Sequence, residues 1–224
     1  MELEKTQELI AQALAQGQNS VLTCSFQAED IALLALLREQ SPAVPVLFLD
    51  TGYHFPEVYA YRDQIAALWG INLINVLPAE TVAEQETHLG LLYQTDPGAC
   101  CRRRKTEPLF GALAAYDLWF TGMRREQAKT RAHLEPLAQA SLPSGQPIMK
   151  ANPLFDWTSS EVFAFLAVRE IPVLSLYDQG YTSVGCAPCT SLPSVPGDPR
   201  SGRWGGQKTE CGIHVHPGGG VEAS

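Results

Sequence analysis

Apolar positions at helical spacing open the chain. Leu3, Leu9, Ile10 and Leu14 fall on one face of a helix that would run from about residue 3 to residue 15, and Gly17 follows as a natural stop. The pattern predicts a first helix with no chemistry of its own.

Short apolar runs then alternate with helical patterns as far as residue 170. Because alternating strands and helices require right-handed crossovers, we expect an α/β fold with an open, mostly parallel sheet flanked by helices. The runs predict strands at residues 20–24, 45–49, 72–76, 118–121 and 148–151, and the helical patterns lie at residues 30–37, 56–69, 107–115 and 158–169.

Length and composition narrow the class of protein. A chain of 224 residues is long enough for one sizeable core. It contains no apolar run long enough for a membrane span, and its first residues are acidic and lack the apolar stretch of a signal peptide. We therefore expect a cytoplasmic protein with no membrane partner, whose thiols stay reduced.

Charge adds a second constraint. The net charge of -8 counts against a nucleic-acid partner. Basic residues nevertheless cluster at residues 102–105 and at Arg124 and Arg125. Such clusters suit a small anionic ligand, although a solvated helix face would look the same.

Cysteines form the most specific pattern in the chain. Cys100 and Cys101 are adjacent, and Cys186 and Cys189 form a Cys-x-x-Cys pair far along the sequence. Four thiolates from two distant pairs suit one inorganic centre, either zinc or an iron–sulfur cluster. A redox-active Cys-x-x-Cys beside two buried cysteines is the third interpretation, and it leaves the Cys100–Cys101 doublet unexplained. Cys24, at a strand end, is expected to be a buried packing residue.

Several polar residues follow the predicted strands. Residues 25–29 form a strand-to-helix turn, the usual place for a phosphate-like anion in an open α/β sheet, although the glycines of a Walker loop are missing. Asp50 and Thr51 follow the second strand, and Arg124 follows the fourth. We expect these strand ends to meet at one ligand site.

Six motifs occur together along the chain, and together they resemble the assimilatory adenylyl-sulfate and phosphoadenylyl-sulfate reductases. The resemblance spans residues 20 to 215, nearly the whole chain. The motifs lie at residues 25–30, 49–57, 100–105, 122–127, 152–157 and 210–214.

The resemblance implies a cofactor and an organisation. Members with both cysteine pairs carry a [4Fe-4S] cluster and reduce adenylyl sulfate, so Cys100, Cys101, Cys186 and Cys189 are the expected ligands. The implied fold is the adenine nucleotide alpha hydrolase-like α/β sheet. We expect one reductase domain at residues 1–216, made of a nucleotide-binding core (18–170) and an irregular cluster-binding and catalytic tail (171–216), with disorder at 217–224.

The resemblance also implies a reaction. Cys211 would attack the sulfonyl sulfur of adenylyl sulfate, release AMP and form an S-sulfocysteine. Reduced thioredoxin or glutaredoxin would then free sulfite. Lys208 and His214 are the nearest groups that could activate the thiol, although His214 could equally be an exposed tail residue.

Arginines suit the charge of the phosphosulfate, and Lys105 would link the substrate to the cluster. Residues 205–210 form a shorter, glycine-containing connector than is usual in the family, which favours a more mobile Cys211 segment. The implied substrate-binding residues are Ser25, Phe26, Gln27, Leu49, Asp50, Thr51, Lys105, Gly122, Arg124, Arg200, Arg203 and His214.

Other functions remain open from the sequence. A phosphoadenylyl-sulfate reductase or an enzyme that accepts both substrates is the nearest alternative. A related ATP pyrophosphatase is a more distant one, and the missing glycine-rich loop and the acidic net charge count against it. A non-catalytic zinc module is another, and it gives no purpose to Cys211 or the arginines. Homo-oligomerisation is also left open.

Overall fold

The computed structural model describes residues 2–206 and residue 212. Its centre is a six-stranded sheet with the order β3-β2-β1-β4-β6-β5. All neighbouring strands are parallel except β5 and β6, so the predicted mostly parallel α/β sheet is confirmed. The strands are β1 (Ser20–Thr23), β2 (Pro45–Leu49), β3 (Asn72–Val76), β4 (Leu118–Phe120), β5 (Leu137–Ser141) and β6 (Pro147–Ala151).

Strand β5 was not expected from the sequence, which predicts only five strands. Its residues include no continuous apolar run, and of its side chains only Ala140 is fully buried. Backbone pairing with β6 holds it in place, with Gln139 opposite Met149. A tight turn closes this hairpin, where the Leu142 N–H donates to the Gln146 carbonyl at 2.8 Å.

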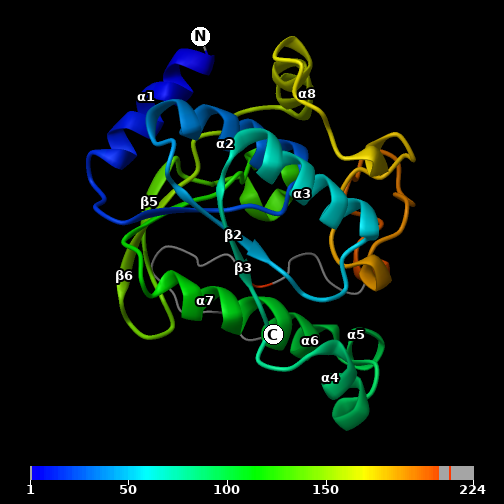
Figure 1. The fold of residues 1–224 in the computed structure, drawn as a ribbon. Helices are drawn as coiled ribbons and strands as arrows, with labels where there is room; N and C mark the ends of the chain where they lie inside the picture. Colours follow the sequence, from blue (N-terminus) through cyan, green and yellow to red (C-terminus); the bar gives the residue numbers. More distant parts are fainter. Residues whose placement is uncertain (1, 207–211, 213–224) are drawn as a thin grey trace.

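Two layers of helices cover the sheet, one on each face (Figure 1). Alternate strand residues point to opposite faces: Leu22 and Phe120 pack under the first layer, whereas Val21 and Trp119 pack against α7. The first layer contains α1 (Glu2–Leu14), α2 (Ala28–Gln40), α3 (Pro56–Trp69) and α8 (Ser159–Val168), and the second contains α4 (Val82–Leu89), α5 (Leu92–Thr95), α6 (Pro97–Cys101) and α7 (Glu107–Leu113).

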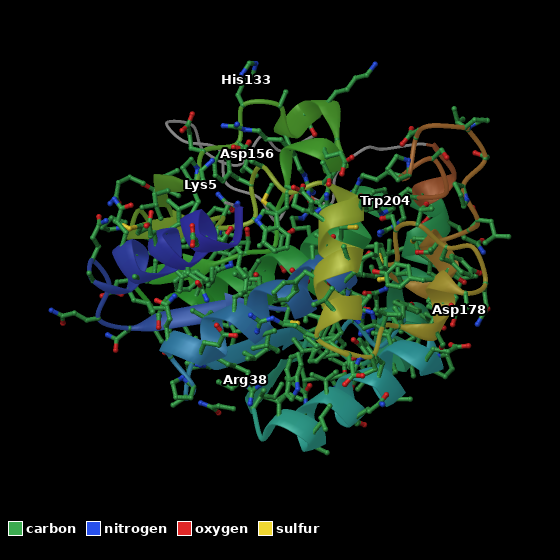
Figure 2. All side chains as sticks on the ribbon, turned by 90° about the horizontal axis from the view of Figure 1, so that it is seen from above. Lys5, Arg38, His133, Asp156, Asp178 and Trp204 are labelled. Atoms are coloured by element: carbon green, nitrogen blue, oxygen red, sulfur yellow. The ribbon has the colours of Figure 1, made fainter. Side chains whose placement is uncertain are left out.

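Local sequence signals set several helix starts. Thr158 and Glu161 form a capping box at the start of α8, where the sequence predicts a helix start. Pro56 occupies the first turn of α3, where its missing N–H costs nothing. An ion pair joins α1 to the segment before α8, two parts of the chain that are far apart in sequence. Its atoms, Lys5 Nζ and Asp156 Oδ2, lie 3.3 Å apart (Figure 2).

From the end of α8 to residue 206 the chain follows an irregular path with three short 3₁₀ turns, as predicted for the tail. This segment is bound to the loop after β2, because Cys186 pairs with His54 and the Ala187 N–H donates to the Tyr53 carbonyl at 2.7 Å. Within the described residues, no helix has the length and apolar character needed to cross a membrane.

Candidate active site and cysteine centre

A pocket of about 350 Å³ lies at the carboxyl ends of the central strands. The chain builds β2 and β3 on one side of β1 and then crosses to place β4 on the other side. Ligands bind in open α/β sheets at such a reversal of strand order. Ser25 after β1, Leu49 at the end of β2 and Gly122 after β4 all line the pocket.

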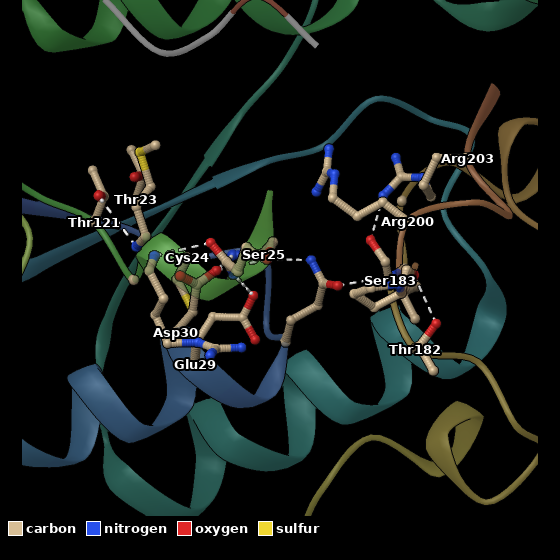
Figure 3. A pocket seen from close by; sticks show the side chains of 18 of the residues that line it. Thr23, Cys24, Ser25, Glu29, Asp30, Thr121, Thr182, Ser183, Arg200 and Arg203 are labelled. Atoms are coloured by element: carbon tan, nitrogen blue, oxygen red, sulfur yellow. Dashed lines mark hydrogen bonds between the residues drawn. The ribbon is translucent and has the colours of Figure 1, made fainter. Parts of the chain in front are cut away.

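The pocket lining carries both positively and negatively charged side chains. Arg200 and Arg203 come from the irregular tail, and Figure 3 shows them across the pocket from Glu29 and Asp30, which lie in the first turn of α2. Burial, with help from the neighbouring Glu29 charge, raises the pKa of Asp30 to about 6. The tail thus supplies cations that suit a phosphate or sulfate group, while the rest of the lining carries both carboxylates, such as Glu29, and a further arginine, Arg124.

Most of the substrate-binding residues expected from the sequence meet here. Phe26 does not line the pocket: its ring is fully buried against Phe48, with ring centroids 5.6 Å apart. Asp50 and Thr51 also lie off the lining, and Asp50 accepts a hydrogen bond of 2.6 Å from the Tyr59 hydroxyl. The expected residues that line the pocket are Ser25, Gln27, Leu49, Lys105, Gly122, Arg124, Arg200 and Arg203.

The expected catalytic residue Cys211 lies outside the described residues, as do His214 and Lys208.

Arg124 has a second task besides lining the pocket. Its guanidinium donates to Glu126 at 2.9 Å, to the Trp157 carbonyl at 3.0 Å and to the Ser159 hydroxyl at 3.1 Å. These contacts hold the start of α8 against the strand end. Its buried Nε has no hydrogen-bond partner among the described residues, which leaves one donor for a ligand.

His54 is a pocket residue that the sequence interpretation missed, although it stands inside the motif at residues 49–57. Its Nε2 lies 2.8 Å from the Leu49 carbonyl oxygen, and its ring packs on Phe48. Burial lowers the pKa of His54 to about 4, so the ring is neutral near pH 7. A neutral ring in this position is suited to orienting the end of β2.

Cys100 and Cys101 lie in α6, which begins after Asp96, whose side chain caps the Ala99 N–H at 2.8 Å. Pro97 is the first residue of this helix. The helix continues as one π-helical turn (Arg102–Thr106), a conformation that is frequent at functional sites.

All four paired cysteines line one small cavity. Cys186 Sγ lies 3.3 Å from the Thr51 hydroxyl, so Thr51 contacts this cavity rather than the pocket. Burial, together with the neighbouring thiols of Cys101 and Cys186, raises the pKa of Cys189 to about 11. Burial and the same group of thiols raise the pKa of Cys100 to about 12. Thiols held in this way need a cationic centre to become thiolates.

The donor set can be tested against the two metal hypotheses. No group of three or more His, Cys, Asp or Glu side chains within residues 2–206 is arranged to hold a single ion. Zinc needs its four ligands around one point, whereas each cysteine of a [4Fe-4S] cluster binds a different iron and the sulfurs stand farther apart. Four cysteines around one cavity form an all-sulfur donor set, which suits either an iron–sulfur cluster or zinc.

Two residues connect the two sites. Lys105 and Trp204 line both the pocket and the cysteine cavity. The Arg203 guanidinium stacks over the Trp204 ring at 4.5 Å, and it also lines the pocket. A ligand in the pocket and a centre held by the cysteines would be neighbours.

Comparison with known proteins identifies the family. The family model for the phosphoadenosine phosphosulfate reductase domain matches residues 19–192. The chain belongs to this family. An adenosine 5'-phosphosulfate reductase from Mycolicibacterium smegmatis is 46% identical to this chain in sequence. The match covers 89% of this chain and 83% of that relative. One from Mycobacterium tuberculosis is 44% identical over 89% of this chain and 80% of the relative.

Solved structures agree with the family and the fold. A phosphoadenylyl-sulfate reductase from Candida auris superposes with a TM-score of 0.73 at 26% identity, and covers 84% of this chain and 90% of its own. An FMN adenylyltransferase from Candida glabrata superposes with a TM-score of 0.61 at 17% identity, over 83% of this chain and 60% of its own. The second similarity shows only that the fold is shared beyond the phosphoadenosine phosphosulfate reductase family.

Proposed function

We propose that the protein reduces adenylyl sulfate to sulfite and AMP in sulfate assimilation, with thioredoxin or glutaredoxin as the electron donor. The observation that carries the proposal is the shared wall: Lys105 and Trp204 line both an arginine-bearing nucleotide pocket and a cavity with four cysteines. The relatives named adenosine 5'-phosphosulfate reductase support the choice of substrate.

The pocket would bind the nucleotide with its sulfonyl group toward the tail. Arg200, Arg203 and Lys105 supply the positive charge that a phosphosulfate needs, and the AMP that leaves carries more charge on its phosphate than the bound ester does. Arginines placed there would stabilise this developing charge. Ser25, Leu49 and Gly122 would contact the adenosine end.

The chemistry would belong to the thiol of Cys211. Its thiolate attacks the sulfur of the sulfonyl group, the S–O bond to AMP breaks, and an enzyme S-sulfocysteine remains. A dithiol reductant attacks the Cys211 sulfur, releases sulfite and leaves as its own disulfide, so that the reductant supplies both electrons. No other cysteine stands near Cys211 in the sequence, which supports an external reductant.

Cys100, Cys101, Cys186 and Cys189 would hold a [4Fe-4S] cluster. When bound, this group supplies structural cross-linking of α6 to the tail and a local electrostatic field, rather than the electrons of the reaction. Lys105 would stand between the cluster and the substrate. We further propose that residues 1–216 act as one domain in the cytoplasm.

Anaerobic purification followed by iron and sulfide analysis tests the cluster, and sulfite release tests the reaction. About four irons per chain are expected. Turnover should favour adenylyl sulfate over its 3′-phosphorylated form. Preference for the phosphorylated form would point to a phosphoadenylyl-sulfate reductase, and zinc with no sulfite from either substrate would refute the proposal.

Two serine variants separate the roles of the cysteines. Cys211→Ser should retain iron and AMP binding but release no sulfite. Cys186→Ser should lose iron, because a hydroxyl is a poor ligand for this centre. A folded, iron-free Cys186→Ser protein with full turnover would rule out a functional role for the cluster.

A further inference from the structure

An aspartate joins the carboxyl ends of the two central strands. Oδ2 of Asp30 accepts hydrogen bonds from the Ser25 N–H at 2.7 Å and from the Ser25 hydroxyl at 2.6 Å. The backbone of Gly122, after β4, lies against the same carboxylate. Asp30 therefore connects the turn after β1, seen in Figure 3, to the turn after β4, and we call this contact the Asp30 clamp.

Close packing reinforces the clamp. A Cβ atom at Gly122 would lie 2.4 Å from Asp30 Oδ1, 3.1 Å from the Asp30 nitrogen and 3.1 Å from the Glu29 carbonyl carbon. Any side chain there would push the β4 turn away from the start of α2. Asp30 thus holds the turn after β1 by hydrogen bonds and the turn after β4 by close contact, at the reversal of strand order that forms the pocket.

A second aspartate makes the same kind of contact at the opposite end of these strands. The Asp117 carboxylate accepts from the Gln18 N–H at 3.1 Å and from the Asn19 N–H at 2.9 Å. It joins the segment before β1 to the start of β4, and it does not line the pocket. Asp117 is therefore a matched control, a clamp on the same pair of strands far from the ligand.

We propose that Asp30 is a positioning residue for the nucleotide, which holds the Ser25 and Gly122 turns at the separation that the adenosine end requires. The inference rests on the proposed function and adds a residue to its site. One carboxylate oxygen, Oδ2, accepts from Ser25, and the other, Oδ1, packs against Gly122. In asparagine one of these oxygens becomes an NH2 group, which either faces the Ser25 N–H donor or adds two hydrogens at the Gly122 contact.

Asp30→Asn and Asp117→Asn test the proposal in the full chain. AMP affinity is measured by calorimetry above the pKa of Asp30, KM and kcat are measured with adenylyl sulfate, and stability is measured by urea unfolding. For Asp30→Asn we expect the Kd for AMP and the KM each to rise about tenfold, while kcat changes less than about threefold, because ground-state and transition-state binding weaken together. For Asp117→Asn we expect a lower unfolding midpoint with Kd and KM within about twofold of wild type.

The outcome can go against the clamp in two ways. The role of Asp30 would be overturned if Asp30→Asn bound AMP with a Kd within about twofold of wild type. It would also be overturned if Asp117→Asn lost as much AMP affinity as Asp30→Asn. If Asp30→Asn does not fold, Gly122→Ala breaks the same contact from the other turn and should raise the Kd for AMP in the same way. A wild-type protein that neither binds AMP nor reduces adenylyl sulfate would refute the proposed function instead.

Discussion

Gly185→Ala should displace the Arg203 side chain without replacing Arg203 itself. A Cβ at position 185 would lie 2.0 Å from Arg203 Nη2, 2.5 Å from its Cζ and 2.9 Å from its Nη1. The obstructed atoms are the end of a long flexible side chain rather than backbone, so the guanidinium can move. Arg203 lines the pocket and stacks on Trp204. Under the proposed function, its movement would remove a charged donor from the phosphosulfate.

The magnitude follows from the kind of contact that is lost. A hydrogen bond to a charged group contributes about 1.5 to 3 kcal/mol. Loss of one such contact to the substrate lowers kcat/KM by roughly 10- to 150-fold. Folding stability should fall by less than about 1 kcal/mol, because a flexible side chain can relieve the overlap and no backbone has to shift.

Sulfite release at varied adenylyl sulfate concentration, together with urea unfolding, measures both quantities. Arg203→Ala should show a similar loss of kcat/KM, and the double variant should be no worse than either single variant, because both remove the same contact. Gly202→Ala is a contrasting control: its Cβ would lie 2.1 Å from the Ser191 carbonyl oxygen, so it should destabilise the tail. Full activity of Gly185→Ala, or additive losses in the double variant, would refute the reasoning.

Three further predictions concern stability. Gly111 is exposed in α7, with open space around it, so Gly111→Ala should raise the free energy of unfolding by about 0.5 to 1 kcal/mol. The melting temperature should therefore rise, and an unchanged or lower melting temperature would contradict the prediction. Thr158→Ala removes the N-cap of α8 and should lower the free energy of unfolding by about 1 kcal/mol, seen as a lower urea midpoint. An unchanged midpoint would show that the cap does not stabilise the fold. Burial raises the pKa of Asp30 to about 6, so Asp30 binds a proton more tightly in the folded protein than in the unfolded chain. The stability of the wild-type protein should therefore fall by up to about 3 kcal/mol as the pH rises from about 4 to about 6. In urea titrations across this range Asp30→Asn should lack that component, and identical pH profiles for the two proteins would contradict the shift.

The core of the fold was predictable from the sequence. Strands β1, β2 and β4 are short apolar runs because both faces of a parallel sheet are covered by helices, and such runs stand out against the helical periodicity around them. Strand β5 was missed for the opposite reason. It is an edge strand with mixed side chains, and its hydrogen bonds to β6 hold it in the sheet.

The candidate site was only partly predictable. Motifs at strand ends predicted pocket residues such as Ser25, Gly122 and Arg124, since parallel strands place their carboxyl ends together. The same motifs also included Phe26, whose side chain belongs to the core, and Thr51, whose hydroxyl meets Cys186. A motif marks a segment, and the backbone conformation decides which way each side chain in it points.

By itself the sequence determined the fold class, the four paired cysteines and the strand-end location of the pocket, because these depend on local periodicity and on residue type. Only the tertiary structure decided that Lys105 and Trp204 would line both sites, that Asp30 would join two turns and that Gly185 would leave room for Arg203. Each of these contacts joins segments far apart in the chain. Their distances follow from how helices and tail pack on the sheet, which no local pattern records.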